Sequence, residues 1–505
     1  MNRFINTKRL KSCLAETLAA VILISSLTGC QSQTAILRSQ SESSSASTVQ
    51  NQTSSEAVSS KTSAASSSAV SSSKASSSQK ASSSKAASKA ASSAVVKAAQ
   101  KVQPKTPTKN VQVGNTAIQK VAIDQQTQTS TRLSVTQSTA STAAYSYMDQ
   151  RSGYSYLSDS ISRSLYSQML ASVYKVTGTP NSYGYYPTER ITVNSHLSES
   201  QLRIALLAFL NDNPQVFWLA RVYSYGYSGN STYIQFYSYV SQTECNAMIQ
   251  QLNSRVTSLI QGMPSGLSEF DREYYLFDFL VKKCTYDTQA VSDDSRWKSF
   301  TSYGAIVEGS VVCEGYARAM QLLSSYAGLQ CILVTGQSDG VNHMWNLMKI
   351  DGSWYHLDIT WSDSNPTIYN YFNVTDAVIR LDHTVSPNAS SLTDAQISGA
   401  DGSATECNLA LPICTATKAN YFSIRGIPIT SLSGNTIVQA IAAALKQKQE
   451  SVSFHVEVNE NHNTVLNKMI NWLSSGISES GVSVKGIKYI TDEPDSGITV
   501  FVSYF

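Results

Sequence analysis

The chain has 505 residues, of which 42% are hydrophobic and 14% charged, and its formal net charge is +3. This length allows several domains with cores of their own, and so small a net charge does not indicate a nucleic-acid partner. The sequence also contains no phosphate-cradling glycine loop and no dinucleotide-binding fingerprint.

The amino terminus has the pattern of an export signal. It begins with basic residues, continues with an apolar run at residues 18–27 and ends in Leu-Thr-Gly-Cys at Cys30. The run is too short for a transmembrane helix, which needs about 20 apolar residues. The segment 1–29 resembles a bacterial lipoprotein signal peptide, which implies that Cys30 carries lipid. We therefore expect a lipid-anchored protein on the outer face of the cell membrane of a Gram-positive bacterium. Ordinary secretion is the alternative, because Glu16 at the start of the run is atypical.

Residues 30–143 form a low-complexity segment dominated by Ser, Ala, Lys and Thr. Such a composition buries too little apolar surface to offset the entropy of ordering, so we expect a disordered tether. Residues 31–110 carry ten Lys or Arg and two Glu, while residues 111–505 carry 24 basic and 32 acidic residues. A cationic tether of this kind can lie along an anionic cell-wall polymer or membrane. The alternative is that its lysines only keep the linker soluble.

Residues 144–264 are rich in tyrosine and predict a small α+β lead domain. Alternating aromatic and polar residues on both sides of Gly229-Asn230 indicate a hairpin, and helical spacing recurs at residues 202–210 and 245–259. The tyrosines suggest a carbohydrate- or wall-binding surface. They are equally typical of half-buried strands, so both interpretations stay open.

Residues 265–390 contain the residues with the clearest chemistry. A helical pattern at residues 271–281 is followed by Cys313, which directly precedes a second helical pattern ending at Gly328. The thiol is thus expected at a helix N-terminus. Free N–H groups and the positive end of the helix dipole there lower a thiol pKa, and the Cys313 N–H can donate to a developing oxyanion.

A hairpin is expected to bring a base and a carboxylate together after this helix. Asp351-Gly352 between two alternating runs predicts a two-residue type I′ turn. Counting outward from Ile350 opposite Ser353 places four side chains on one face of the ribbon: His343, Trp345, Asp358 and Thr360. His343 and Asp358 are then diagonal neighbours, within reach of a hydrogen bond.

Three motifs in chain order resemble the transglutaminase-like superfamily. They are Val-Cys-Glu-Gly-Tyr-Ala at residues 312–317, His-Met-Trp-Asn at 343–346 and Trp-Tyr-His-Leu-Asp-Ile-Thr-Trp at 354–361. The resemblance implies a papain-like α+β core with a catalytic triad of Cys313, His343 and Asp358. No cofactor and no metal are expected, and the side chains expected to line the substrate site are Tyr316, Trp345 and Trp361.

The remaining histidines receive lesser roles. We expect His356 to be a wall residue of the site, with a smaller role as a second titrating group. The others have no motif around them and are expected on the surface or in the core: His196, His383, His455 and His462.

A Cys-His-Asp triad indicates acyl transfer on protein or peptide carbonyl groups. A lysine amine can resolve the acyl-enzyme and give a cross-link, or water can resolve it and give deamidation or proteolysis. We favour hydrolysis, because water is the abundant acceptor. The alternative from another class is a non-catalytic surface adhesion or wall-scaffolding protein that retains the fold.

Residues 391–505 predict a separate small α+β accessory domain. Its expected elements are a strand, a helix at 436–449, a strand at 452–458, a helix at 464–473 and closing strands. Cys407 and Cys414 can pair or stay reduced, and no Cys/His spacing suggests a zinc site.

Overall fold

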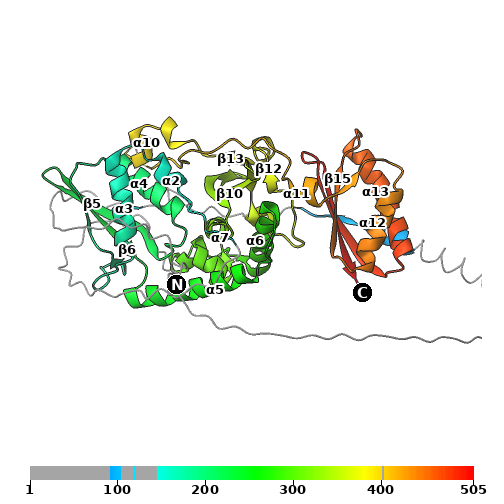
Figure 1. Ribbon diagram of the computed structural model, residues 1–505, viewed down its shortest axis with the longest axis horizontal. Helices are drawn as coiled ribbons and strands as arrows, with labels where there is room; N and C mark the ends of the chain where they lie inside the picture. The colour runs from blue at the N-terminus through cyan, green and yellow to red at the C-terminus, as the bar shows by residue number, and fades with distance from the viewer. Residues whose placement is uncertain (1–90, 104–118, 121–144, 401–402) are drawn as a thin grey trace, which may run out of the picture. The chain divides into compact units, whose positions relative to one another are not determined.

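The computed structural model describes residues 91–103, 119–120, 145–400 and 403–505 (Figure 1). The predicted signal peptide, the predicted lipidation site Cys30 and most of the predicted tether lie outside these residues. The described chain forms two compact units, one built from residues 103–425 and the other from residues 91–102 and 426–505. The predicted boundary at residue 264 falls inside the first unit, and residues 391–425 also belong to it.

The amino-terminal part of the first unit is a small sheet with helices. The predicted hairpin is confirmed as β5 (Leu219–Ser228) and β6 (Ser231–Ser238), and Gly229 at its turn has a positive φ of 58°. The predicted helices are confirmed as α4 (Glu199–Asp212) and α5 (Gln242–Gly262), each with a serine N-cap. The sheet and the helices before it are completed by α2 (Ser152–Tyr156), α3 (Ser160–Ser172), β2 (Gln119–Lys120), β3 (Tyr186–Pro187) and β4 (Ile191–Val193).

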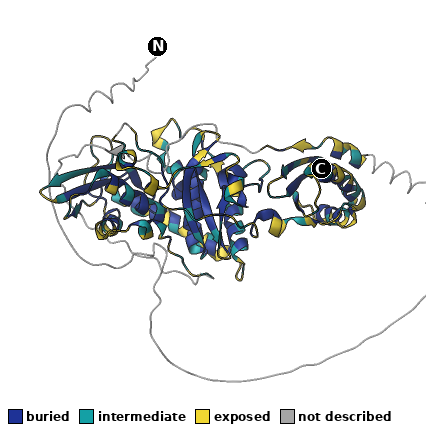
Figure 2. Cartoon of the chain, turned by 90° about the horizontal axis from the view of Figure 1, so that it is seen from above, coloured by how far each residue is buried: buried dark blue, intermediate teal, exposed yellow. Residues whose placement is uncertain are grey.

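The second part of the first unit has α7 (Cys313–Tyr326) packed against an antiparallel five-stranded sheet. The strand order is β12 (Phe372–Val374), β11 (Ser353–Leu357), β10 (Val341–Ile350), β9 (Gln330–Ser338) and β13 (His383–Val385). The predicted helix at 271–281 is α6 (Glu269–Lys283). Most residues of β9 and β10 are buried (Figure 2), and α7 packs on both strands.

Short elements connect these larger ones. They are β7 (Thr285–Tyr286), η3 (Asp294–Phe300), η4 (Gly304–Glu308), β8 (Ser310–Val311), α8 (Ile359–Ser362), α9 (Asp376–Ile379), η5 (Ala389–Ser391), α10 (Asp394–Ser398) and α11 (Tyr421–Arg425). Strands β7 and β8 pair in parallel, with Tyr286 beside Val311.

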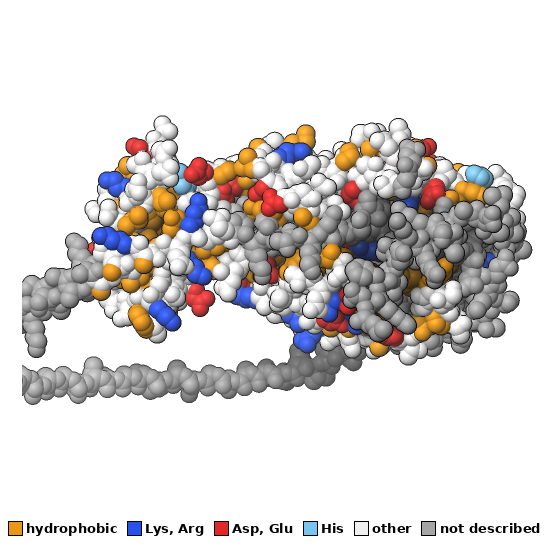
Figure 3. Space-filling view, turned by 180° about the vertical axis from the view of Figure 1, so that it is seen from behind, with side chains coloured by type: hydrophobic (Ala, Val, Ile, Leu, Met, Phe, Trp, Pro, Cys, Tyr) orange, Lys and Arg blue, Asp and Glu red, His pale blue; other side chains and the backbone are white. Residues whose placement is uncertain are grey.

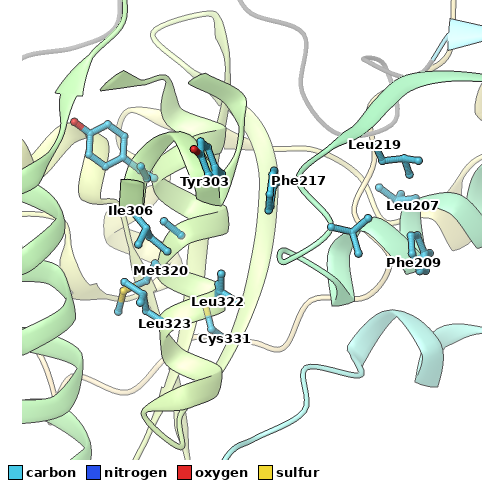
Figure 4. Packing of buried hydrophobic residues seen from close by; sticks show 14 of the residues in the cluster. Leu207, Phe209, Phe217, Leu219, Tyr303, Ile306, Met320, Leu322, Leu323 and Cys331 are labelled. Atoms are coloured by element: carbon cyan, nitrogen blue, oxygen red, sulfur yellow. The ribbon is translucent and has the colours of Figure 1, made fainter. Parts of the chain in front are cut away.

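One hydrophobic cluster extends through both parts of the first unit (Figure 4). Phe217, just before β5, stacks on Tyr303 with ring centroids 4.9 Å apart, and Tyr303 belongs to the same cluster as Met320 of α7. The Tyr-rich segment therefore buries its apolar residues against the core, and the two parts share one interior.

The second unit has its own core. A sheet ordered β1 (Gln100–Lys101), β16 (Val484–Asp492), β17 (Gly497–Tyr504), β15 (Ser451–Val456) and β14 (Ile427–Ile429) packs with α12 (Asn435–Lys446) and α13 (His462–Ser480). The predicted helices and strands of this region are confirmed. Strand β1 differs from the prediction. Residues 100–101 lie in the predicted disordered tether but pair in parallel with β16.

Within the described residues, no helix combines the length and apolarity that a bilayer span requires. The six cysteines of these ranges are all free and buried, including Cys407 and Cys414. On the face shown in Figure 3, acidic and basic side chains of the described residues are intermixed.

Candidate active site

Cys313 is the first residue of α7, and the preceding Val312 offers no side-chain cap to the N–H groups of the first turn. The glycine of the motif has a packing role two residues later. A Cβ on Gly315 would lie 2.6 Å from the Ser299 carbonyl oxygen and 2.7 Å from Cγ1 of Val311. Only glycine allows the segment before α7 to pack this closely on the first turn of the helix.

The Cys313 side chain is buried, with 1% of the residue exposed. Burial raises the pKa of the thiol to about 12. The Met344 N–H opposes this rise, while the carboxylates of Glu314 and Asp358 add to it. The structure thus differs from the lowered pKa expected at a helix N-terminus, because desolvation outweighs the helix dipole here. The thiol rests protonated.

His343 lies near the start of β10 and hydrogen-bonds the predicted carboxylate. Its Nε2 is 2.7 Å from Oδ2 of Asp358, and both side chains are buried. Its Nδ1 is buried and has no hydrogen-bond partner. The backbone N–H of the next residue, Met344, reaches the Cys313 thiol. The thiol therefore contacts the backbone of β10 next to His343, and Nδ1 is the ring nitrogen left to act as a base.

The predicted hairpin register is confirmed from Ile350 opposite Ser353 to Asn346 opposite Leu357. Asp351 and Gly352 both have positive φ, 49° and 84°, as a type I′ turn requires. The predicted strand position of Thr360 is wrong, because β11 ends at Leu357 and the chain enters α8. Asp358 is the N-cap of that helix, and its Oδ1 accepts a hydrogen bond from the Trp361 N–H at 3.2 Å.

Asp358 is ionised in this setting. Burial opposes its charge, but His343 and His383 hydrogen-bond to it and hold the pKa of the carboxyl well below its usual range. A buried carboxylate that accepts from an imidazole fixes the tautomer and orientation of the ring.

The three predicted lining residues are all buried. Trp345 stacks on His343 with ring centroids 5.7 Å apart, and its indole N–H donates to Nδ1 of His356 at 2.9 Å. The Tyr316 hydroxyl donates to Asp363, and the Trp361 indole donates to Ser338 Oγ at 3.2 Å. Their contact with a substrate stays a prediction.

His383 was assigned no role from the sequence, yet it lies beside the predicted triad. Its Nε2 is 3.1 Å from Oδ2 of Asp358, and its Nδ1 is 2.6 Å from Oδ1 of Asp382. Burial lowers the pKa of His383, but the two carboxylates prevail and raise it to about 9. No local signal could have found this residue, because β13 reaches the site only by pairing with β9.

Tyr286 is a second residue that sequence reasoning missed. The β7–β8 pairing brings it to the start of α7, where its buried hydroxyl lies beside the Cys313 backbone N–H and forms no hydrogen bond of normal geometry. Burial raises the pKa of this hydroxyl, so it stays a proton donor. A carbonyl oxygen in this position would meet two donors.

Two groups of side chains within the described residues have three potential metal-ligand atoms within 4.8 Å of one another. One is His343, Asp358 and His383, where Nε2 of each ring already hydrogen-bonds Oδ2 of Asp358. The other is His356, Asp376 and Cys414. There the indole donates to Nδ1 of His356, so the proton of a neutral ring sits on Nε2 and faces Asp376. That tautomer leaves no lone pair for a metal.

The segment that carries these residues is similar to known proteins. The family model of the transglutaminase-like superfamily matches residues 257–359, a range that includes Cys313, His343 and Asp358. The chain is 26% identical to kyphoscoliosis peptidase of Mus musculus over 122 residues, which is 22% of this chain and 18% of that protein. It is 24% identical to the Homo sapiens protein of the same name over 135 residues, 24% of this chain and 19% of that one. The chain thus spans about a fifth of the length of these relatives.

A crystal structure of a TGase shares 17% identity, with a TM-score of 0.21 over 34% of this chain and 50% of that chain.

Proposed function

Because residues 257–359 belong to the transglutaminase-like superfamily, we propose that this protein is a cysteine acyl-transfer enzyme acting on carboxamide or peptide bonds of proteins. Cys313 is the nucleophile, His343 the base and Asp358 the residue that orients the base. The observation that supports this most directly is the His343 ring. One of its nitrogens is bonded to a buried carboxylate and the other is open, and the thiol contacts the N–H of the next residue, Met344.

The chemistry follows from the resting protonation states. A protonated thiol needs a base at the moment of attack, so Nδ1 of His343 accepts the Cys313 proton as sulfur bonds to the carbonyl carbon. The ring then carries a positive charge that Asp358 stabilises. The tetrahedral oxyanion faces the Cys313 N–H and the Tyr286 hydroxyl. The same ring returns the proton to the leaving nitrogen as the acyl-enzyme forms.

Water or a lysine amine then attacks the thioester. We propose that hydrolysis is the main outcome, since water is the abundant acceptor. The Leu-Thr-Gly-Cys motif supports attachment of the enzyme to the outer face of the membrane through Cys30, with the Lys-rich tether free to meet anionic wall polymers.

The test is to incubate the purified protein with a glutamine-rich protein and a labelled primary amine. Mass spectrometry then reads the products beside those of a Cys313→Ala variant. Amine incorporation lost in the variant indicates a cross-linking transferase, while deamidation or chain cleavage lost in the variant indicates a hydrolase. If an extract of bacterial envelope proteins also yields no Cys313-dependent product, the scaffold interpretation replaces this one.

A further inference from the structure

His383 lies between two carboxylates, and its hydrogen bonds define its protonation. Nδ1 faces Asp382 at 2.6 Å and Nε2 faces Asp358 at 3.1 Å. An ionised carboxylate only accepts hydrogen bonds, so a ring bonded to one on each side carries a proton on both nitrogens. Asp382 is held in turn by the Tyr371 hydroxyl, which donates to its Oδ2 at 2.7 Å. The ring is thus a buried imidazolium between two carboxylates.

His383 and His343 bind the same oxygen atom of Asp358. Both Nε2 atoms approach Oδ2, at 3.1 and 2.7 Å, and the two rings lie 5.5 Å apart. The two rings therefore share one oxygen of a single buried carboxylate, and the positive charge of His383 neutralises the charge of that carboxylate.

We propose that His383 is a positioning residue that, as a buried cation, neutralises the charge of Asp358 and holds its Oδ2 atom where it orients His343. This inference rests on the proposed function, because it assigns His343 the role of base. It also bears on the nucleophile, since the charge of Asp358 raises the pKa of the Cys313 thiol and a neutralising cation reduces that effect.

Within the described residues, His383 faces Asp358, Asp382 and His343, and His356 interacts with it at longer range. Its remaining ring neighbours are aromatic: Trp345, Trp361 and Tyr371. His383 and Asp382 lie beyond residues 257–359, so the family match does not include this pair.

The first test reads the protonation of His383 directly. In the full-length protein labelled with 15N-histidine, two-bond proton–nitrogen correlation spectra distinguish neutral rings from doubly protonated ones. We expect one ring to remain doubly protonated from pH 6 to about 8.5. Its signal should vanish in His383→Gln and persist in the matched control His196→Gln. A His383 that is neutral at pH 7.5 would overturn the proposal.

A second variant covers the case in which His383→Gln does not fold. Asp382→Asn removes one carboxylate but keeps the His383 ring. The pH at which the doubly protonated signal disappears should therefore be at least about one unit lower than in the wild-type protein. An unchanged transition would contradict the assignment.

The third measurement separates positioning from structural support. In His383→Gln, the unneutralised charge of Asp358 should raise the pKa of the Cys313 thiol further, so alkylation by iodoacetamide at pH 8.5 should become about tenfold slower. Cys245 and Cys331 are buried internal controls. An unchanged or faster rate at Cys313, or an equal fall at all three cysteines, would count against the proposal. The spectra report on His383 even if Cys313 turns over no substrate, so a failure of the proposed function is recognised separately.

Discussion

Individual atoms left without partners indicate where the chemistry of this site takes place. Nδ1 of His343 and the hydroxyl of Tyr286 are both buried and unpaired, although buried polar atoms are normally hydrogen-bonded. The Tyr286 hydroxyl lies beside the Cys313 backbone N–H, and the Cys313 thiol contacts the N–H of Met344, the residue after His343. A substrate that enters this region would provide the missing partners, a proton for the ring nitrogen and an oxyanion for the hydroxyl.

Tyr286→Phe tests the oxyanion assignment. The variant keeps the ring and removes one donor, so we expect kcat to fall by about 10²-fold with little change in KM. Tyr303→Phe is the matched control, because that buried tyrosine donates to Gln251 away from the thiol. Equal activities for the two variants would exclude Tyr286 from the oxyanion site.

The reactivity of Cys313 tests its resting state. Since burial raises the pKa of this thiol to about 12, the wild-type protein should react with iodoacetamide at pH 7 more slowly than a free cysteine does. Peptide mapping by mass spectrometry identifies the modified residue, and urea-unfolded protein gives the reference rate. Rapid alkylation at pH 6 to 7 would instead show a preformed thiolate–imidazolium pair.

At the scale of elements, α6 meets β12 through a buried acid and amide. Asn373 Nδ2 donates to Oε2 of Glu273 at 2.7 Å, while Oε1 of Glu273 and Oδ1 of Asn373 have no partner. Burial raises the pKa of Glu273 to about 8. A neutral Glu273 carboxyl has an O–H group, which provides the donor that these two oxygens lack. The contact between α6 and β12 is therefore uncharged.

Glu273→Gln should raise stability at neutral pH. The folded-state pKa lies above the unfolded value of about 4.5, so wild-type stability is full below pH 4.5 and falls as pH rises toward 8. At pH 7 this loss is about 3 kcal/mol as an upper estimate. Gln offers a donor and an acceptor without charge, so the variant should lose this pH dependence. Thermal unfolding of both proteins between pH 4.5 and 8 measures this pH dependence of stability.

The exposed Glu244→Gln on α5 is the control for that measurement, and its unfolding curve should keep the wild-type pH dependence. A Glu273→Gln variant that is less stable than wild type at both pH 4.5 and pH 8 would show that the carboxyl is charged and paired in the folded protein.

At the scale of the whole molecule, two cores organise the described chain, and the second recruits a segment distant in sequence. Val96 is buried in the cluster of the C-terminal unit, and β1 adds an edge strand to β16. Residues 91–102 therefore belong to that unit, although their composition resembles the rest of the tether.

Deleting residues 91–102 from the otherwise intact protein should destabilise this unit alone. Loss of Val96 and of the β1 pairing costs about 2 kcal/mol or more. Hydrogen exchange should become faster in peptides from β16 and stay unchanged in peptides from α7. Replacing residues 78–89 with Gly and Ser provides a control of equal length, and equal exchange in both proteins would show that β1 does not contribute.

The sequence by itself determined what depends on near neighbours: the Asp351-Gly352 turn, the hairpin register, the helix that begins at Cys313 and the α+β pattern of both units. Steric limits on φ and periodic burial act over a few residues and can be read directly. Only the tertiary structure decided what depends on distant contacts. Pairing of β13 with β9 places His383 at Asp358, pairing of β7 with β8 places Tyr286 at Cys313, and burial raises the thiol pKa against the helix dipole. Desolvation and charge pairing act through space, and no local pattern records which segments will meet.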